Sequence, residues 1–412
     1  MASTIKSDNG VSSGVTGIVQ TADSSGQLAL QTTNSSGTAV TALTLNNSQQ
    51  ATFANTINVP NTFGFKNRII NGGMVIDQRN AGASGTPSGT GVIYYLDRWY
   101  CYASQASKFT MGQNLNSVTP PTGFSNYYGL QVASAVSIGA TDRFLVTQGI
   151  EAYNIADLSW GTANAATVTL SFWVRSSLTG TFGGSLGCGQ STYTYPFTYT
   201  ISSANTWTYI TITIAGPTAG TWTANNSGGV YIQFGLGVGS TYSGAAGSWS
   251  SGNYNSATGG TSVVGTASAT WYITGVQLEV GTQATSFDYR PYGTELAFCQ
   301  RYYCTFGGST VYEHIGTWGS AYATTAATTT VVFPVSMRTI PSLTYSGSLQ
   351  LEDGVNANVA ITSVGLSSSG IERGVLSSGV NWFVSSGLTV YRPYQAFTGN
   401  STSAYVGFSA EL

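Results

Sequence analysis

Short stretches in which apolar and polar residues alternate recur along most of the chain. Between residues 168 and 175, the even-numbered positions are Val, Leu, Phe and Val, whereas the odd-numbered positions are Thr, Ser, Trp and Arg. Successive side chains of a strand point to opposite faces, so this pattern predicts a strand with one buried face.

Stretches of this kind fill residues 65–290, where many are rich in Val, Ile, Thr, Tyr, Phe and Trp and most are flanked by Gly, Ser or Asn. We expect strands at 92–96, 166–175, 197–201, 209–214, 230–238 and 269–280. Strands with one apolar face bury that face when one sheet packs on another. The pattern therefore predicts a two-sheet sandwich over residues 65–290, with a jelly roll as the expected topology.

The first 64 residues form a ribbon of shorter alternating segments. The pairs Leu28-x-Leu30, Leu43-x-Leu45 and Ile57-x-Val59 recur at a spacing of about 15 residues, which predicts repeated hairpins. Each hairpin carries too few apolar groups to close a core in one chain. We therefore expect residues 1–64 to form an interleaved, trimeric β shaft that anchors the protein. A flexible tail is the alternative.

Residues 291–412 form the last predicted module. One helical turn is expected at 293–298, with Thr294 as its N-cap, and it is followed by a β-like run at 300–306. Alternating stretches then resume, for example at 329–333, 382–384 and 404–408. These predict a smaller, distal β-sandwich, which makes the whole chain all-β.

Composition excludes several classes of protein. Only 7% of the 412 residues are charged, against roughly a quarter in an ordinary soluble domain. Coiled coils and helical bundles need many more charged residues. Thirteen basic residues balanced by 15 acidic ones provide no field for holding nucleic acid. Disorder is excluded because 42% of the residues are hydrophobic.

Membrane, metal and cofactor functions find no support either. No stretch of about 18 apolar residues is present and the start lacks an apolar signal core, so we expect no membrane insertion and assembly in a cytoplasm. Cys101, Cys188, Cys299 and Cys304 are too sparse for a disulfide scaffold, and they are expected to be core thiols. With His314 as the one histidine and no Cys-x-x-Cys pair, neither zinc nor any cofactor is expected.

Three stretches carry a family resemblance. They are Asn67–Gly82, Tyr95–Trp99, and Ile273–Gly281 running on to Phe287, Arg290 and Gln300–Tyr303. Together they resemble the carbohydrate-binding-like modules of bacteriophage tail fibres, over residues 65 to 305. Less specifically, the stretch 42–54 resembles the virion-attaching ends of such fibres. The resemblance implies a homotrimeric virion fibre that contacts host-surface glycans, but it assigns no sugar-contact residues.

Charged residues near these motifs have a structural interpretation. Asp77, Arg79, Asp97 and Arg98 flank Trp99, and we expect them to form ion pairs that pin a sheet edge or a protomer contact. Catalysis by a glycosidase would need two carboxylates across a sugar. The possible pairs are Asp142 with Glu151, and Glu352 with Asp353, which point to opposite faces if they lie on a strand. No nucleophile elbow is present, and Glu313 is poorly placed to orient His314.

Aromatic residues in uncharged loops are the stronger signal for binding. Sugars stack their C–H faces on flat rings and pair their hydroxyls with Asn, Gln, Ser and backbone groups. The candidate glycan contacts are Trp222, Tyr242, Trp249 and Tyr254, in or beside the polar stretch 239–260, and Trp318, Tyr322 and Trp382 in the last module. The alternative is that each ring braces its loop or fills a protomer seam.

The sequence favours a non-enzymatic phage tail fibre. Residues 1–64 would attach it to other virion tail proteins, residues 65–290 would form the carbohydrate-binding-like jelly roll, and residues 291–412 would form the distal sandwich. A head fibre or decoration protein, a glycan depolymerase and a cellular adhesin remain alternatives.

Overall fold

The computed structural model describes residues 3–8, 17–21, 27–33, 37–46, 51–53, 65–356, 358–367 and 372–412. The chain separates into two compact units, Met1–Thr62 and Phe63–Leu412. Each unit is described by itself.

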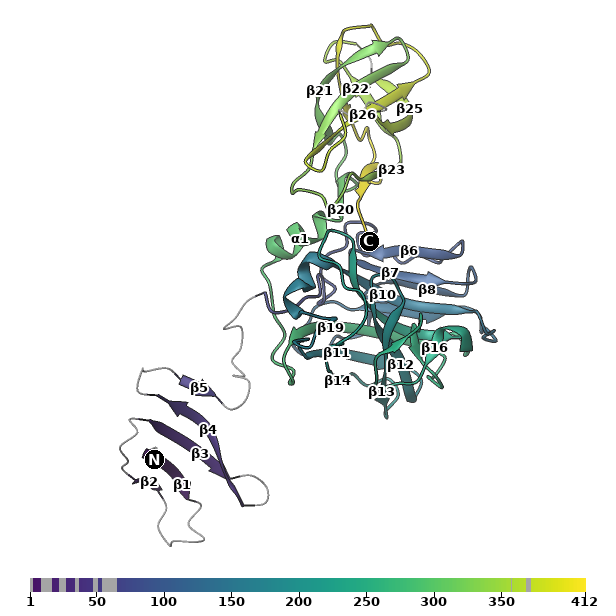
Figure 1. The fold of residues 1–412 in the computed structure, drawn as a ribbon. Coiled ribbons are helices and arrows are strands. Elements are labelled where there is room, and N and C mark those ends of the chain that lie inside the picture. Colours follow the sequence, from purple (N-terminus) through teal and green to yellow (C-terminus); the bar gives the residue numbers. More distant parts are fainter. Residues whose placement is uncertain are drawn as a thin grey trace. The chain divides into compact units, whose positions relative to one another are not determined.

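The N-terminal unit contains one five-stranded sheet (Figure 1). Its strands are β1 (Ser3–Asp8), β2 (Gly17–Thr21), β3 (Leu28–Thr33), β4 (Ala39–Leu45) and β5 (Ala51–Phe53), in the order β2-β1-β3-β4-β5. The two leucine pairs face each other, because Leu28 lies opposite Leu45 and Leu30 opposite Leu43. The expected segment 57–59 falls outside the described residues.

This sheet has little core of its own. Among the side chains described in it, Ala29 is the buried hydrophobic residue, whereas Val40 and Phe53 are both nearly half exposed. The strands predicted from the pairs Leu28-x-Leu30 and Leu43-x-Leu45 are confirmed as β3 and β4. Interleaving of three chains stays a prediction.

The second unit begins with two sheets packed face to face. The seven-stranded sheet has the order β17-β13-β12-β15-β10-β7-β6, and the five-stranded sheet has the order β14-β11-β19-β9-β8. Their strands are β6 (Gly91–Leu96), β7 (Trp99–Ala103), β8 (Phe109–Gln113), β9 (Tyr128–Val132), β10 (Arg143–Glu151), β11 (Val168–Ser176), β12 (Gly180–Cys188), β13 (Tyr193–Ile201), β14 (Thr208–Ile214), β15 (Gly228–Val238), β17 (Ser250–Ser251) and β19 (Thr270–Val280). Strands β16 (Ser243–Gly244) and β18 (Ser256–Ala257) form a small separate pair.

One continuous core fills the space between the sheets. Phe172 of β11 packs edge-on against Phe234 of β15, with ring centroids 5.0 Å apart, and Trp99 and Trp271 complete the contact from β7 and β19. The apolar positions of 168–175 are fully buried, as their alternation predicts. The predicted β-sandwich is therefore present in this segment.

The C-terminal segment differs from the expected second sandwich. Strands β21 (His314–Ala323), β22 (Ala326–Val332), β24 (Gln350–Glu352), β25 (Val359–Leu366), β26 (Ser377–Val384) and β27 (Pro393–Phe397) close into a barrel. Closure occurs because β21 pairs with both β22 and β27. Alternation has the same period in a barrel and in a sandwich, so the sequence pattern does not separate the two.

A helix and a small sheet lie between the sandwich and the barrel (Figure 1). Helix α1 (Tyr292–Gln300) is capped by Pro291 rather than by Thr294, so the predicted N-cap is wrong. Strands β20 (Tyr303–Gly307), β28 (Tyr405–Ser409) and β23 (Ser342–Ser346) form the three-stranded sheet. Cys299 and Cys304 thus lie on a helix and a strand rather than on one strand, and all four cysteines are buried thiols.

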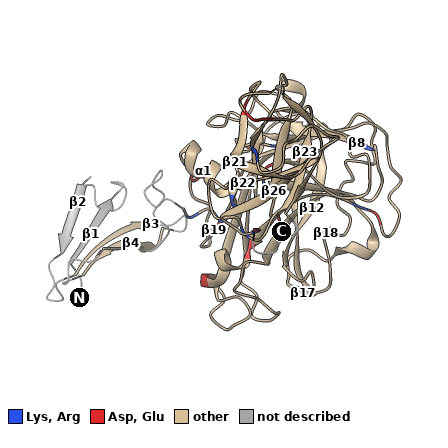
Figure 2. Ribbon diagram, turned by 90° about the horizontal axis from the view of Figure 1, so that it is seen from above, with Lys and Arg blue, Asp and Glu red and all other residues tan. Residues whose placement is uncertain are grey.

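Charged residues are sparse and scattered over the described part of the chain (Figure 2). None of the helices among the described residues is long and apolar enough to cross a membrane.

Candidate functional site

A groove on the outer face of the seven-stranded sheet is the strongest candidate site. Alternation along β7 places Trp99 and Cys101 in the core, and it leaves Tyr100 and Tyr102 on the opposite face. We call the resulting cavity, of about 280 Å³, the sheet groove. It is lined by Val92, Tyr100, Tyr102, Arg143, Leu145, Gly189, Ser191, Tyr231, Gln233, Asn253, Asn255 and Leu412.

Two central strands provide the rest of the floor. In β10, Leu145 lies opposite Tyr102, and in β15 Tyr231 and Gln233 alternate with the core residues Ile232 and Phe234. Because these strands are hydrogen-bonded neighbours, the positions of their side chains are fixed by sheet register rather than by loop conformation. The sheet groove therefore has a rigid floor.

Residues 239–260 form one wall by crossing the outer face of the sheet. Ser256 of β18 lies directly over Gly235, where an added Cβ would be 2.5 Å from its Oγ atom. Glycine at 235 is required by this close approach. The tip of the loop is held by Thr194, whose hydroxyl donates to the carbonyl of Gly252 at 3.1 Å.

Amide side chains are oriented along this wall. Gln233 Oε1 accepts hydrogen bonds from Ser185 Oγ and from Asn255 Nδ2, both at 2.9 Å, so the Gln233 amide group is left as a donor. Asn255 Nδ2 also donates to Asn253 Oδ1 at 3.1 Å. Asn255 is only 3% exposed, and its Oδ1 atom is buried with no hydrogen-bond partner among the described residues. The groove thus offers the amide donor of Gln233, whereas Asn255 Oδ1 is not accessible from it.

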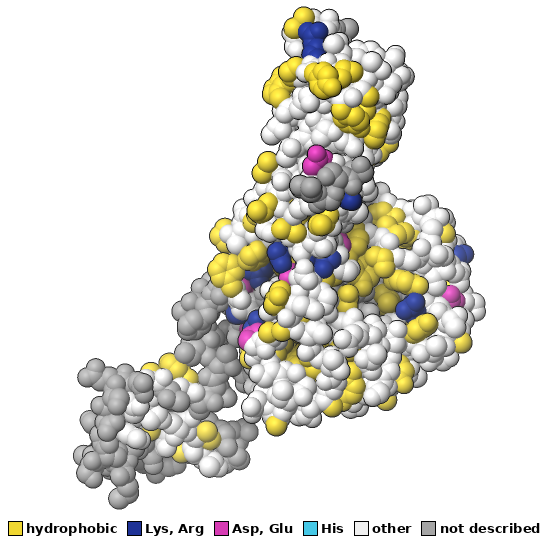
Figure 3. Space-filling model, turned by 45° about the horizontal axis from the view of Figure 1, so that its top comes forward, with side chains coloured by type: hydrophobic (Ala, Val, Ile, Leu, Met, Phe, Trp, Pro, Cys, Tyr) yellow, Lys and Arg dark blue, Asp and Glu magenta, His cyan; other side chains and the backbone are white. Residues whose placement is uncertain are grey.

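Arg143 is the charged side chain of the lining. Its guanidinium lies 4.3 Å from the ring of Tyr102 and 4.1 Å from the ring of Tyr242, and its Nη2 donates to the Tyr102 hydroxyl at 3.0 Å. Burial raises the pKa of Tyr100 and of Tyr231. These tyrosines therefore stay neutral, and their hydroxyls remain available as donors. On the face drawn in Figure 3, hydrophobic side chains gather over part of the sandwich and charged ones are few.

The four aromatic residues predicted near 239–260 take different places. Tyr242 stacks on Arg143 beside the sheet groove. Tyr254 packs against Gly244 and Gly252 within its own loop. Trp222 and Trp249 form a cluster with Trp160, in which ring centroids are 4.9 to 5.7 Å apart, and their indole N–H groups donate to Ala219 and Ala215. The structure does not bring these two tryptophans into the groove.

The three aromatic residues predicted in the last module lie in the barrel. Trp318 and Tyr322 are about half exposed on β21, so their role as glycan contacts stays a prediction. Trp382 is fully buried in the barrel core, and its indole N–H donates to Thr329 Oγ1 at 2.9 Å. A buried ring has no face for a sugar, so the prediction for Trp382 is wrong.

The motif arginines do not pair with the motif aspartates. Arg79 and Arg98 both form ion pairs with Glu411, in the first case at 2.8 Å. Asp97 accepts hydrogen bonds from the backbone and side chain of Gln78, and Asp77 accepts them from Asn80 and Gly82. Within the described ranges, neither aspartate has a cation within ion-pair distance. Burial raises the pKa of Asp97 to about 7.

The motif residues hold the second unit together. Asn67 Nδ2 donates to the carbonyl of Val276 at 3.0 Å, and a Cβ on Gly72 would collide with the same carbonyl. Arg98 lies 3.5 Å from the ring of Tyr302, and Tyr302 donates to Glu151 at 2.8 Å. These stretches therefore join the sandwich to the segment that carries the barrel.

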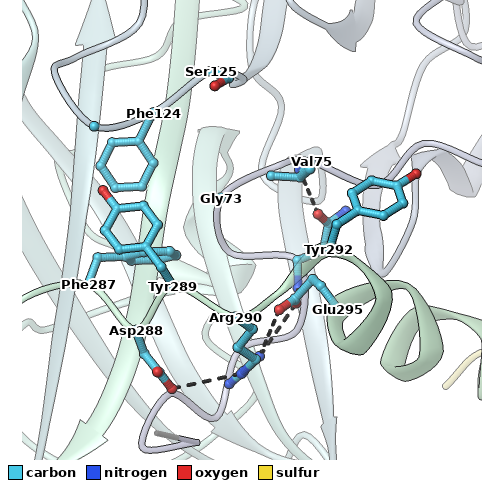
Figure 4. Close-up of a pocket in the computed structure, with 12 residues that line it drawn as sticks. Gly73, Val75, Phe124, Ser125, Phe287, Asp288, Tyr289, Arg290, Tyr292 and Glu295 are labelled. Carbon is cyan, nitrogen blue, oxygen red and sulfur yellow. Dashed lines mark hydrogen bonds and ion pairs between the residues drawn. The ribbon is translucent and has the colours of Figure 1, made fainter. Parts of the chain in front are cut away.

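A second cavity, of about 180 Å³, lies beside the start of α1 (Figure 4). Phe124, Phe287 and Tyr289 form one side, with ring centroids 4.9 to 5.6 Å apart. On the other side, Arg290 pairs with Glu295 at 3.2 Å and donates to the carbonyl of Ile69 at 3.0 Å. Arg290 and Glu295, which are charged groups of this cavity, hold neighbouring segments together. The cavity is therefore the weaker candidate.

Metal-binding groups do not gather in the described part of the chain. No three side chains of His, Cys, Asp or Glu lie close enough there to hold an ion. His314 is half exposed and pairs with Glu352 at 2.8 Å.

No family model and no curated protein matches this sequence. Several solved structures that match are carbohydrate-binding modules. CBM4 is 13% identical, with 45% of this chain and 95% of that chain covered and a TM-score of 0.25. TmCBM61 with β-1,4-galactotriose is 8% identical, with 44% and 88% covered and a TM-score of 0.23. The family 11 module from Clostridium thermocellum, in complex with a β-1,3-1,4-mixed-linked tetrasaccharide, is 10% identical, with 48% and 99% covered and a TM-score of 0.24. These TM-scores are low, so the likeness assigns no function to this chain.

Proposed function

We propose that this protein is a non-enzymatic subunit of a bacteriophage tail fibre, which attaches to host-surface glycans through the sheet groove. The observation that carries the proposal is the chemistry of the groove floor. Tyr100, Tyr102 and Tyr231 line it beside the amides of Gln233 and Asn255. Aromatic faces pack against the C–H faces of sugars, while amides and phenols pair with their hydroxyls.

The lining supports binding rather than hydrolysis. Glycosidases need two carboxylates flanking the scissile bond, and the described lining of the sheet groove contains neither Asp nor Glu. Outside the groove, Glu151 is held by Arg301 at 2.6 Å and by Tyr302 at 2.8 Å. Asp142 accepts from Ser104 at 2.7 Å and from the backbone of Gly139 at 2.8 Å.

The fibre and trimer parts of the proposal rest on the sequence and on the N-terminal sheet. Residues 67–82 and 95–99 resemble tail-fibre modules, and the N-terminal sheet leaves Val40 and Phe53 exposed. Three copies around one axis would cover such side chains and would attach to other tail proteins of the virion. Trimerisation also raises the avidity of weak single-sugar contacts, because later contacts form at a high effective concentration.

An array of bacterial surface glycans, probed with labelled full-length protein, tests this function. We expect binding to a subset of glycans and a strong loss for Tyr231→Ala combined with Gln233→Ala. Tyr209→Ala, which removes an exposed ring from the five-stranded sheet, is the matched control and should bind normally. The proposal would be contradicted if the protein bound no glycan, or if binding survived in the groove variant and was lost in Trp318→Ala.

A further inference from the structure

Arg143 lacks the carboxylate partner that most arginines of this protein have. Six other arginines form ion pairs with Asp or Glu: Arg68, Arg79, Arg98, Arg290, Arg301 and Arg392. Over the described ranges, no carboxylate lies within 4.0 Å of the Arg143 guanidinium. Its hydrogen bond to the neutral hydroxyl of Tyr102 uses one of five N–H donors.

The surroundings of Arg143 shield its charge without neutralising it. The rings of Tyr102 and Tyr242 lie within 4.3 Å of the guanidinium and displace water from it. Its Nε atom is buried and makes no hydrogen bond within the part of the chain that the structure describes. Electrostatic interactions strengthen when water is excluded, so a ligand anion would bind this cation more strongly than it would bind an exposed one.

A second observation indicates that the ligand also carries hydroxyl groups. Gln233 lines the groove, and its Oε1 atom already accepts from Ser185 Oγ and from Asn255 Nδ2, both at 2.9 Å. Its Nε2 group is therefore left to donate to an oxygen of the ligand, beside the phenols of Tyr100 and Tyr231. Amides and phenols in such a lining pair with sugar hydroxyls.

We infer that the sheet groove selects an acidic glycan, in which a sugar carboxylate binds Arg143 and sugar hydroxyls bind Gln233. The planar guanidinium matches a carboxylate through two parallel N–H···O bonds. This inference rests on the proposed function and adds the substrate class to it.

Titration calorimetry with matched acidic and neutral probes tests the inference. The full-length protein is titrated with oligogalacturonate and with its carboxyl-reduced form, and in parallel with sialyllactose and with lactose. We expect at least one acidic probe to bind about tenfold or more tightly than its neutral counterpart. That difference should shrink as salt is raised, because added ions screen the carboxylate.

Variants test whether the sugar carboxylate binds Arg143. Arg143→Gln should remove the preference, so that the acidic and the neutral probe bind with equal affinity, while Arg143→Lys should retain part of the preference. Arg175→Gln is the matched control, because Arg175 lies on the five-stranded sheet and donates to the carbonyl of Asn205. Arg175→Gln should bind like the unchanged protein. A thermal melt verifies that each variant folds.

Two results would overturn the inference while leaving the proposed function standing. The first is equal affinity for acidic and neutral probes, both lost in Tyr231→Ala. The second is a salt-independent preference for the acidic probe. If no glycan binds, on the array or in solution, the proposed function fails along with the inference.

Discussion

At the scale of single residues, alternation predicts which side chains face the core but not which outer face is hollow. The same alternation that buries Phe172 and Val174 in β11 places Tyr100 and Tyr102 of β7 and Tyr231 of β15 on an outer face, so the sequence pattern could have indicated these tyrosines. They were missed because aromatic residues within strands are usually core residues. The groove also depends on residues 239–260 lying across the sheet, a long-range contact that no local pattern encodes.

The contact between Gly235 and Ser256 yields a test of the groove wall. Gly235→Ala should push the loop off the sheet, because the new methyl group would meet Ser256 Oγ. Overpacking of this kind costs about 1–3 kcal/mol of unfolding free energy, and glycan affinity should fall with it. Urea denaturation measures the stability change. Gly89→Ala, which meets no atom within 4 Å, is the control and should leave the stability unchanged.

Asp97 should make the protein less stable as pH rises from about 4 to about 7. Its pKa is raised from 3.8 to about 7 by burial, so the folded state holds a proton that the unfolded state has released. Stability falls with pH wherever the folded state binds more protons. Asp97→Asn should flatten this part of the profile of unfolding free energy against pH. An unchanged slope in the variant would show that Asp97 is not the group responsible.

At the scale of elements, strands were easier to predict than their assembly. The strands at 168–175 and 230–238 follow from their pattern. The pattern of the last module predicts a sandwich, and the observed barrel differs because its closure depends on β21 pairing with β27. A helix near residue 293 is predicted correctly, but it begins at Tyr292, before the predicted N-cap Thr294. Glu295 in its first turn pairs with Arg290, a contact that also involves the motif segment 67–71. Pairings across hundreds of residues leave little local signal.

The joint between the sandwich and the C-terminal segment depends on Glu411. Replacing it by Gln would leave the buried side chain of Arg98 and the nearly buried side chain of Arg79 without a countercharge. Breaking a buried pair costs about 3–5 kcal/mol, so the melting temperature should fall sharply. Asp157→Asn removes an exposed partner of Arg68 and should cost less than about 1 kcal/mol. Equal melting temperatures for the two variants would contradict this account of the joint.

At the scale of the whole molecule, a charge content of only 7% suits the proposed contacts, which are between copies of the chain and with glycans. Charged groups in the described part of the chain are concentrated in ion pairs such as Arg301 with Glu151, while the sheet groove contains one cation. Fibre attachment and trimerisation remain predictions from the sequence. They involve contacts between copies of the chain, which the fold of one copy does not define.

Trimerisation has a direct test. Light scattering coupled to size exclusion should give three times the 42.9 kDa chain mass at micromolar concentration. Deletion of residues 1–64 should abolish incorporation into virions while the sandwich still melts cooperatively. A stable full-length monomer would contradict the trimeric shaft.

The most direct test of the central claim is titration calorimetry of full-length protein with the strongest ligand found on the glycan array. We expect saturable binding, and we expect the affinity to fall at least tenfold in Tyr231→Ala combined with Gln233→Ala, because two contacts of the groove floor are lost. The Tyr209→Ala control should retain full affinity. Unchanged affinity in the groove variant, with its fold intact, would place glycan binding outside the sheet groove and contradict the claim.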